Sequence, residues 1–134
     1  MPPKDTLQLV EYWAAGARYE LKSASSLFND KQWMTSMFHG HLAIQKALKA
    51  VFVYQRREHA PLLHSLPFLA GKLDLEFDKA QMKWLEDMNQ YNIEGRYPED
   101  IEELEVKLRP DIAEVLLKES KEMVTWLLKA LRAS

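Results

Sequence analysis

Three polar side chains on one predicted helix are the residues of this chain best suited to binding or catalysis. His41, Gln45 and Lys49 recur at every fourth position within residues 38–50, which read FHGHLAIQKALKA. At about 100° per residue, His41 and Gln45 fall inside the apolar face of this helix, and Lys49 continues their row at its edge. A polar group beside a core needs a hydrogen-bond partner, because leaving it unsatisfied costs about 1–3 kcal/mol. The row therefore indicates an interface, a buried network or a ligand site.

The same helix carries a loose basic flank that includes Lys46, Lys49 and Arg56. Lys49 can act as a point charge toward phosphate, and the imidazole of His41 can act as acid, base or hydrogen-bond donor. One interpretation is a cleft for a nucleotide or RNA, with His41, Gln45, Lys46 and Lys49 as binding residues. The other is structural: a hydrogen-bonded polar network at a helix or dimer contact, beside a solvated basic face.

Two later segments complete a pattern that begins with this helix. Residues 64–69 read HSLPFL, and residues 91–98 read YNIEGRYP. In their order and spacing, the three segments resemble the HEPN domain family of small all-helical prokaryotic proteins. The resemblance runs from about Trp13 to the last predicted helix. We therefore expect a single HEPN-like helical domain over residues 1–134.

By this resemblance, the chain is a subunit that binds nucleotide or RNA, or that docks a small nucleotidyltransferase encoded nearby. Such pairs are often toxin–antitoxin modules, and their HEPN subunits are usually homodimers. Arg96 and Tyr97 match the family's Arg-Tyr-Pro element, in which Arg96 can bind phosphate through two parallel hydrogen bonds. Alternatively, Arg96 pairs with Glu94 or Glu99, and Tyr97 simply packs.

The resemblance also suggests an enzyme, a metal-independent endoribonuclease toxin with Arg57 and His64 as catalytic residues. Many HEPN ribonucleases carry an Arg and a His separated by four to six residues, which act on the 2′-OH and the scissile phosphate. Six residues separate Arg57 from His64. The family motif usually lies around the last helices, however, and His64 also matches the His that opens a segment typical of non-catalytic members. A binding subunit is therefore the first expectation, and the nuclease is the alternative.

Gly40, Leu42 and Gln45 depart from the family's usual segment, which has Cys, Gln and Glu at these positions. Without a carboxylate at position 45, a general-base or metal role for this helix loses support, whereas recognition and assembly roles do not. A glycine inside a helix costs about 1 kcal/mol relative to alanine. We explain Gly40 by the close approach of another helix, from the same chain or from a second subunit.

No metal and no cofactor is expected. His39 and His41 lie about 200° apart on a helix, so they cannot hold one ion together. The sequence has no glycine-rich phosphate loop and no serine nucleophile elbow. It also lacks cysteine, which excludes disulfides, thiol catalysis and cysteine-ligated zinc.

Composition and length indicate one ordinary globular domain. The 134 residues are 47% hydrophobic and 28% charged, with a net charge of −2. Any basic binding site must therefore be local, and the acidic run 99–105 disfavours a large nucleic-acid footprint on its side. The N-terminus lacks a signal-peptide pattern, and no segment approaches the roughly 20 apolar residues of a membrane span. We expect a cytoplasmic protein without membrane association.

The elements that must position these residues are helices throughout. The pattern predicts an all-α, up-and-down bundle of four long helices plus a short helix. Asp5 or Thr6 is expected to cap the first helix, Asp30 the second and Asp78 the fourth, and the acidic run 99–105 is at most briefly helical. The predicted helices span about 6–28, 31–56, 64–72, 78–92 and 110–132.

Overall fold

The computed structural model describes residues 5–132 and is all-α, as predicted. Its described part holds six helices and no strand. Their bounds are α1 Thr6–Asn29, α2 Trp33–Arg56, α3 Leu66–Gly71, α4 Lys79–Asn89, α5 Pro98–Lys107 and α6 Pro110–Lys129.

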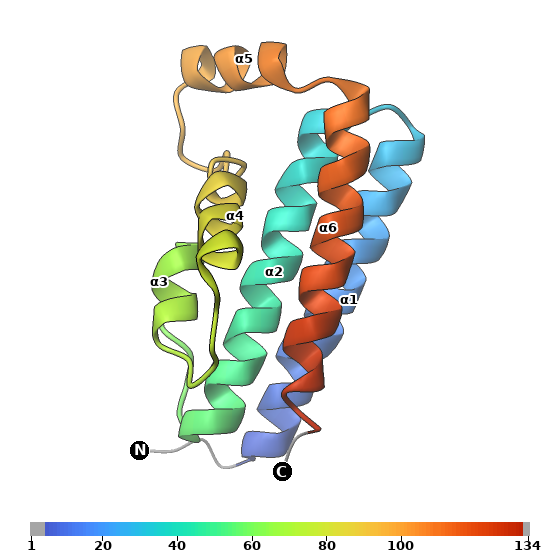
Figure 1. Cartoon of the computed structure of the whole chain (residues 1–134). Helices are drawn as coiled ribbons and strands as arrows, with labels where there is room; N and C mark the ends of the chain where they lie inside the picture. Colours follow the sequence, from blue (N-terminus) through green and yellow to red (C-terminus); the bar gives the residue numbers. More distant parts are fainter. Residues whose placement is uncertain (1–4, 133–134) are drawn as a thin grey trace.

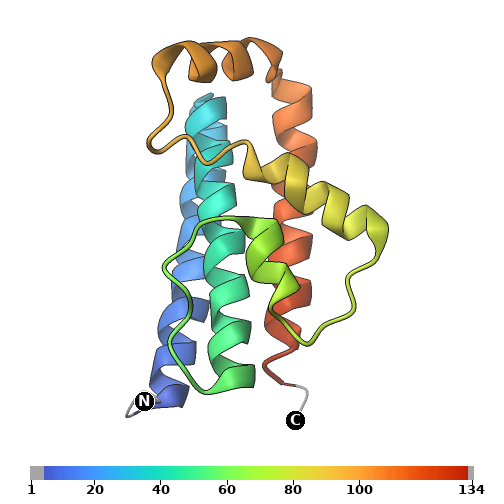
Figure 2. The same cartoon turned by 90° about the vertical axis from the view of Figure 1, so that its left-hand side faces the viewer.

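The core of the fold is a bundle of three long helices, where the sequence suggested four. Helices α1, α2 and α6 run side by side, while α3 and the 11-residue α4 pack together against one side of the bundle (Figure 1). Helix α5 lies across one end (Figure 2). This acidic segment is a full ten-residue helix because Pro98 occupies its first turn, Glu99 and Asp100 favour its N-terminus, and Leu104 is buried.

Helix α2 is the central element, with buried residues on all its sides. Gly40 faces one side chain of α4 and one of α6. A Cβ atom at Gly40 would lie 3.2 Å from Met88 Cε and 3.4 Å from Ser120 Oγ. The predicted close approach is confirmed, and the approaching helices belong to the same chain.

Local capping explains most of the helix ends. The Asp5 side chain accepts a hydrogen bond from the Gln8 N–H, and Asp78 forms a capping box with Gln81, both at predicted caps. The prediction of Asp30 as the cap of α2 is wrong. The chain turns through Lys31, whose φ is 62°, and α2 starts after Gln32 without a side-chain cap.

Candidate functional site

The segments that carry the family resemblance meet at what we call the polar junction, where α2 faces the start of α3 and the end of α4. Its members are His41, Gln45, His64, Asn89 and Arg96. Gln45 Nε2 donates a hydrogen bond to His64 Nδ1 at 2.6 Å. Asn89 Oδ1 accepts from the Leu66 N–H at 3.0 Å and so ties the end of α4 to the start of α3. The polar junction is therefore assembled by contacts between elements distant in sequence.

His41 is the fully buried residue of the polar junction. Neither of its ring nitrogens makes a hydrogen bond of normal geometry. Burial lowers its pKa to about 4, against smaller opposing effects from the Asn89 side chain and the His64 backbone. The positive charge of Arg96 also lowers this pKa, which places Arg96 near the polar junction. His41 is therefore neutral near pH 7 and has no access to a ligand in solvent.

His64 is an exposed member of the polar junction, as is Arg96. An amide nitrogen can only donate, so the bond from Gln45 makes His64 Nδ1 the acceptor and places the ring proton on Nε2. His64 does not cap α3, because the Ser65 side chain accepts from the Phe68 N–H in that role. The free edge of His64 therefore presents a hydrogen-bond donor.

Arg96 and Tyr97 lie on the exposed loop that follows α4. In the part of the chain that the structure describes, Arg96 makes no ion pair with Glu94 or Glu99. It lines a cavity of about 220 Å³ that Asp100 also lines. Tyr97 is 74% exposed, so it does not pack into the core. Both side chains are accessible to a ligand.

Lys46 belongs to a different environment, the contact between α2 and α1. Its Nζ lies 3.1 Å from Glu20 Oε2, and the other oxygen of Glu20 accepts from His39 Nδ1 at 3.0 Å. Glu20 is buried, and Gly16 leaves room for the Lys46 stem, whose Cδ would lie 3.0 Å from a Cβ there. Lys46 is thus paired with an internal carboxylate on α1.

Lys49 also turns toward α1 rather than toward His64. Its Nζ lies 5.1 Å from the centre of the Trp13 ring, a cation–π contact. Burial lowers the pKa of Lys49, and the nearby charge of Lys46 lowers it further. The predicted row on α2 is therefore divided, because His41 and Gln45 face α3 and α4, whereas Lys49 faces α1. Lys46, from the basic flank, faces α1 as well.

Arg57 and His64 are not brought together within one chain. Arg57 ends α2 as its left-handed C-cap, with φ 59°. His64 is anchored to Gln45, which lies twelve residues earlier on the same helix, or about 18 Å along its axis. Arg96 is the arginine whose charge reaches His41 at the polar junction and helps to lower the pKa of that residue.

Sequence reasoning missed Asn89 and Glu20. Asn89 ends a helix, where a polar residue is unremarkable, and Glu20 follows exposed residues on α1. Within residues 5–132, no group of three His, Cys, Asp or Glu side chains is placed to hold a metal ion. No helix in that range is long and apolar enough to cross a membrane.

These features define a class of all-helical bundle proteins. In this class, polar residues of α2 meet the segments around α3 and after α4 at one junction. The chain matches the HEPN domain over residues 10–131, and it belongs to this family. Membership supports a role related to nucleotides or RNA in general.

The fold is also seen in a solved structure, that of TT1696 from Thermus thermophilus. The two superpose with a TM-score of 0.77 at 19% sequence identity, over 90% of this chain and 97% of that chain. A likeness at this identity establishes the shared fold. No curated protein matches the chain.

Proposed function

We propose that this protein is a HEPN-type subunit that binds nucleotide or RNA at the exposed side of the polar junction. Arg96 would bind phosphate, His64 would donate a hydrogen bond from Nε2, and Tyr97 would stack on a base. The observation that carries the proposal is the hydrogen bond from Gln45 Nε2 to His64 Nδ1. It holds His64 in place and leaves its donor edge exposed.

The same hydrogen bond separates this proposal from the nuclease. A general base needs a free lone pair on the nitrogen that faces the 2′-OH. In His64 the lone pair of Nδ1 is engaged by Gln45, and the exposed Nε2 carries the proton. Metal-independent RNA cleavage by Arg57 and His64 would also need a second chain to supply one of the two residues. The engaged Nδ1 lone pair and the need for a second chain both favour a binding role over catalysis.

The assembly of the protein is part of the proposal. We infer a homodimer that docks a small nucleotidyltransferase within a toxin–antitoxin module, as the family resemblance implies. Large exposed apolar side chains support a protein contact, since Leu62 is 91% exposed and Tyr19 69% exposed.

Fluorescence anisotropy with labelled single-stranded RNA and labelled nucleotide tests the binding site. We expect Arg96→Ala to weaken binding about 5–10-fold and to reduce the salt dependence by about one counterion. Tyr97→Ala should weaken RNA binding by a similar factor if one base stacks on it. Arg18→Ala is the matched control, since Arg18 is an exposed arginine on α1 paired with Glu11. Equal affinities for Arg96→Ala and Arg18→Ala would contradict the proposed site.

RNA degradation without divalent metal tests the alternative. We expect the wild-type protein to leave RNA intact. Cleavage that both His64→Ala and Arg57→Ala abolish would establish the endoribonuclease and overturn the binding proposal.

A further inference from the structure

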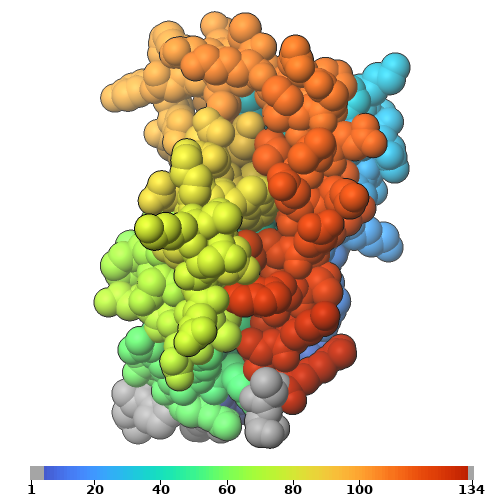
Figure 3. All heavy atoms as spheres, in the orientation of Figure 1, coloured from blue at the N-terminus to red at the C-terminus, as the bar shows by residue number. Residues whose placement is uncertain are grey.

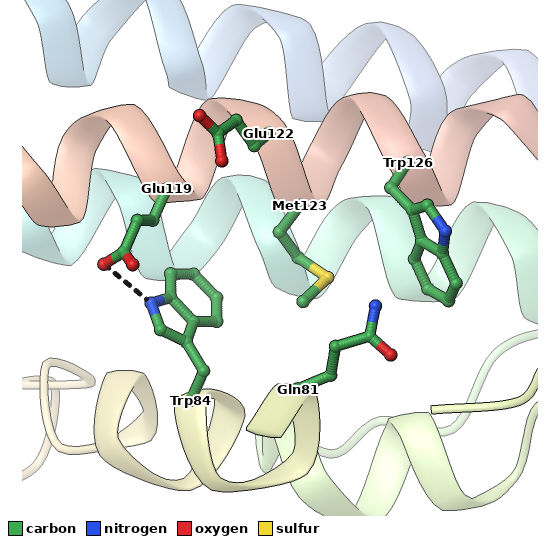
Figure 4. Close-up of a pocket in the computed structure, with 6 residues that line it drawn as sticks. All are labelled: Gln81, Trp84, Glu119, Glu122, Met123 and Trp126. Atoms are coloured by element: carbon green, nitrogen blue, oxygen red, sulfur yellow. Dashed lines mark hydrogen bonds between the residues drawn. The ribbon is translucent and has the colours of Figure 1, made fainter. Parts of the chain in front are cut away.

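A pocket of about 400 Å³ lies between α4 and α6 and shares no residue with the polar junction. The side chains of α4 (yellow) and α6 (orange to red) adjoin on the face turned to the viewer in Figure 3. The volume is within the usual range for small-molecule sites. Six residues line the pocket, namely Gln81, Trp84, Glu119, Glu122, Met123 and Trp126 (Figure 4).

Contacts within the chain orient both indole rings of the pocket. Trp84 Nε1 donates a hydrogen bond to Glu119 Oε1 at 3.1 Å, which links α4 to α6. Trp126 packs edge-on against Phe77, with ring centres 5.3 Å apart and planes at 65°. Trp126 nevertheless stays 36% exposed. Figure 4 shows Met123 between the two indoles. Such prior ordering reduces the entropic cost of binding.

The lining carries negative charge and no basic side chain. In Figure 4 the Glu122 carboxylate points away from Met123, so Glu119 supplies the nearer charge. In the described part of the chain, neither Glu119 nor Glu122 makes an ion pair. Lys121 and Lys129 line the neighbouring hollow, which shares only Glu122 and Trp126 with this pocket. The pocket itself therefore suits a cation.

We propose that the α4–α6 pocket binds a small organic cation with an alkylated ammonium head. Trp84, Trp126 and the Glu119 carboxylate all line the pocket, and aromatic rings and a carboxylate both attract such a group. Met123 offers an apolar contact to its methyl groups. A guanidinium or primary ammonium brings several N–H donors that each need an acceptor. One Glu119 oxygen already accepts from Trp84, so a cation without N–H groups fits the lining better.

Calorimetric titration with choline tests the ligand class. The matched ligand is 3,3-dimethylbutan-1-ol, which has the same shape without the charge. We expect choline to bind about 5-fold or more tightly than this alcohol. Equal affinities would show an apolar pocket, and absence of saturable choline binding would show no cation site. Either result would overturn the proposal.

Two substitutions test the residues. Glu119→Gln keeps an acceptor for Trp84 but removes the charge, so choline affinity should fall about 3-fold or more while the alcohol is unaffected. Glu114→Gln removes an exposed carboxylate from the same helix, outside the pocket, and is the control. Trp126→Leu should weaken choline binding further, and Trp126→Phe should restore part of it because a ring face returns. Equal choline affinities for Glu119→Gln and Glu114→Gln would rule out the electrostatic part of the proposal.

Discussion

Residue 45 sets the chemical form of His64. Gln45 donates to Nδ1, so we expect His64 to carry its proton on Nε2. The family usually has Glu at this position. In Gln45→Glu the carboxylate can only accept, so Nδ1 should become the protonated nitrogen and donate to it.

Long-range proton–nitrogen NMR spectra report this tautomer directly. The expected result is Nε2–H in the wild type and Nδ1–H in Gln45→Glu, with the exposed His59 unchanged as the internal control. An Nδ1–H tautomer in the wild type would contradict the donor role proposed for His64.

His41 makes the stability of the fold depend on pH. Burial lowers its pKa to about 4 from the ordinary 6.5. Between these values the unfolded chain binds the proton and the folded chain does not, so stability increases with pH across this window. Above pH 6.5 the protonation of His41 costs the folded protein little stability. As the pH drops to 4, the free energy of unfolding decreases by roughly 2–3 kcal/mol through this residue.

Urea denaturation between pH 4 and 7 measures this effect. Comparison of the wild type with His41→Gln removes the contribution of carboxylates that titrate in the same range. The variant should show a shallower decrease toward pH 4. His59→Gln, at an exposed position, should behave like the wild type, and an identical slope for all three proteins would show that His41 does not control the decrease.

At the scale of elements, α1 and α2 are joined by a buried charge. Glu20 accepts from both His39 and Lys46. Glu20→Gln removes the counter-charge of Lys46 and leaves a single acceptor oxygen for two donors, so the free energy of unfolding should fall by about 1–3 kcal/mol. Glu11→Gln is the matched control on the same helix, since the Glu11–Arg18 pair is exposed and should contribute less than about 1 kcal/mol. Equal losses in urea denaturation would contradict this account.

Gly40 and Gly71 should respond differently to substitution, because only Gly40 packs against α4 and α6. No atom lies within 4 Å of a Cβ at Gly71, whereas Met88 and Ser120 lie close to one at Gly40. Gly71→Ala should therefore stabilise the fold by about 0.5–1 kcal/mol. Gly40→Ala should lack this gain, and Gly40→Leu should lose about 2 kcal/mol or more through overpacking. A stable Gly40→Leu protein in thermal denaturation would show that α4 and α6 can move aside.

At the scale of the whole molecule, we expect two chains to associate. Light scattering coupled to size exclusion should give a mass twice the 15.7 kDa of one chain. The exposed Leu62, Tyr12 and Tyr19 are apolar surface that such a contact can cover. A mass of one chain at every concentration would contradict the dimer and would remove the route by which Arg57 and His64 could meet.

The fold class was readable from the sequence because its signals are local. Asp5 and Asp78 act on backbone groups a few residues away, and the apolar period of α1, α2 and α6 repeats within single helices. The lengths of the shorter helices were less accurate. The helix predicted over 78–92 is the 11-residue α4, Lys79–Asn89. Residues 98–107 extend into a helix partly because Leu104 is buried by contacts that the local pattern does not reveal.

The sequence by itself determined that this chain is helical, that it belongs among HEPN-like proteins and that position 45 lies on the inner face of α2. Only the tertiary structure decided which neighbour each polar residue meets. Lys46 and Lys49 turn to Glu20 and Trp13 on α1, while Gln45 turns to His64. The physical reason is that helical periodicity fixes the angle of a side chain around its own axis, whereas the partner at that angle depends on how distant helices pack.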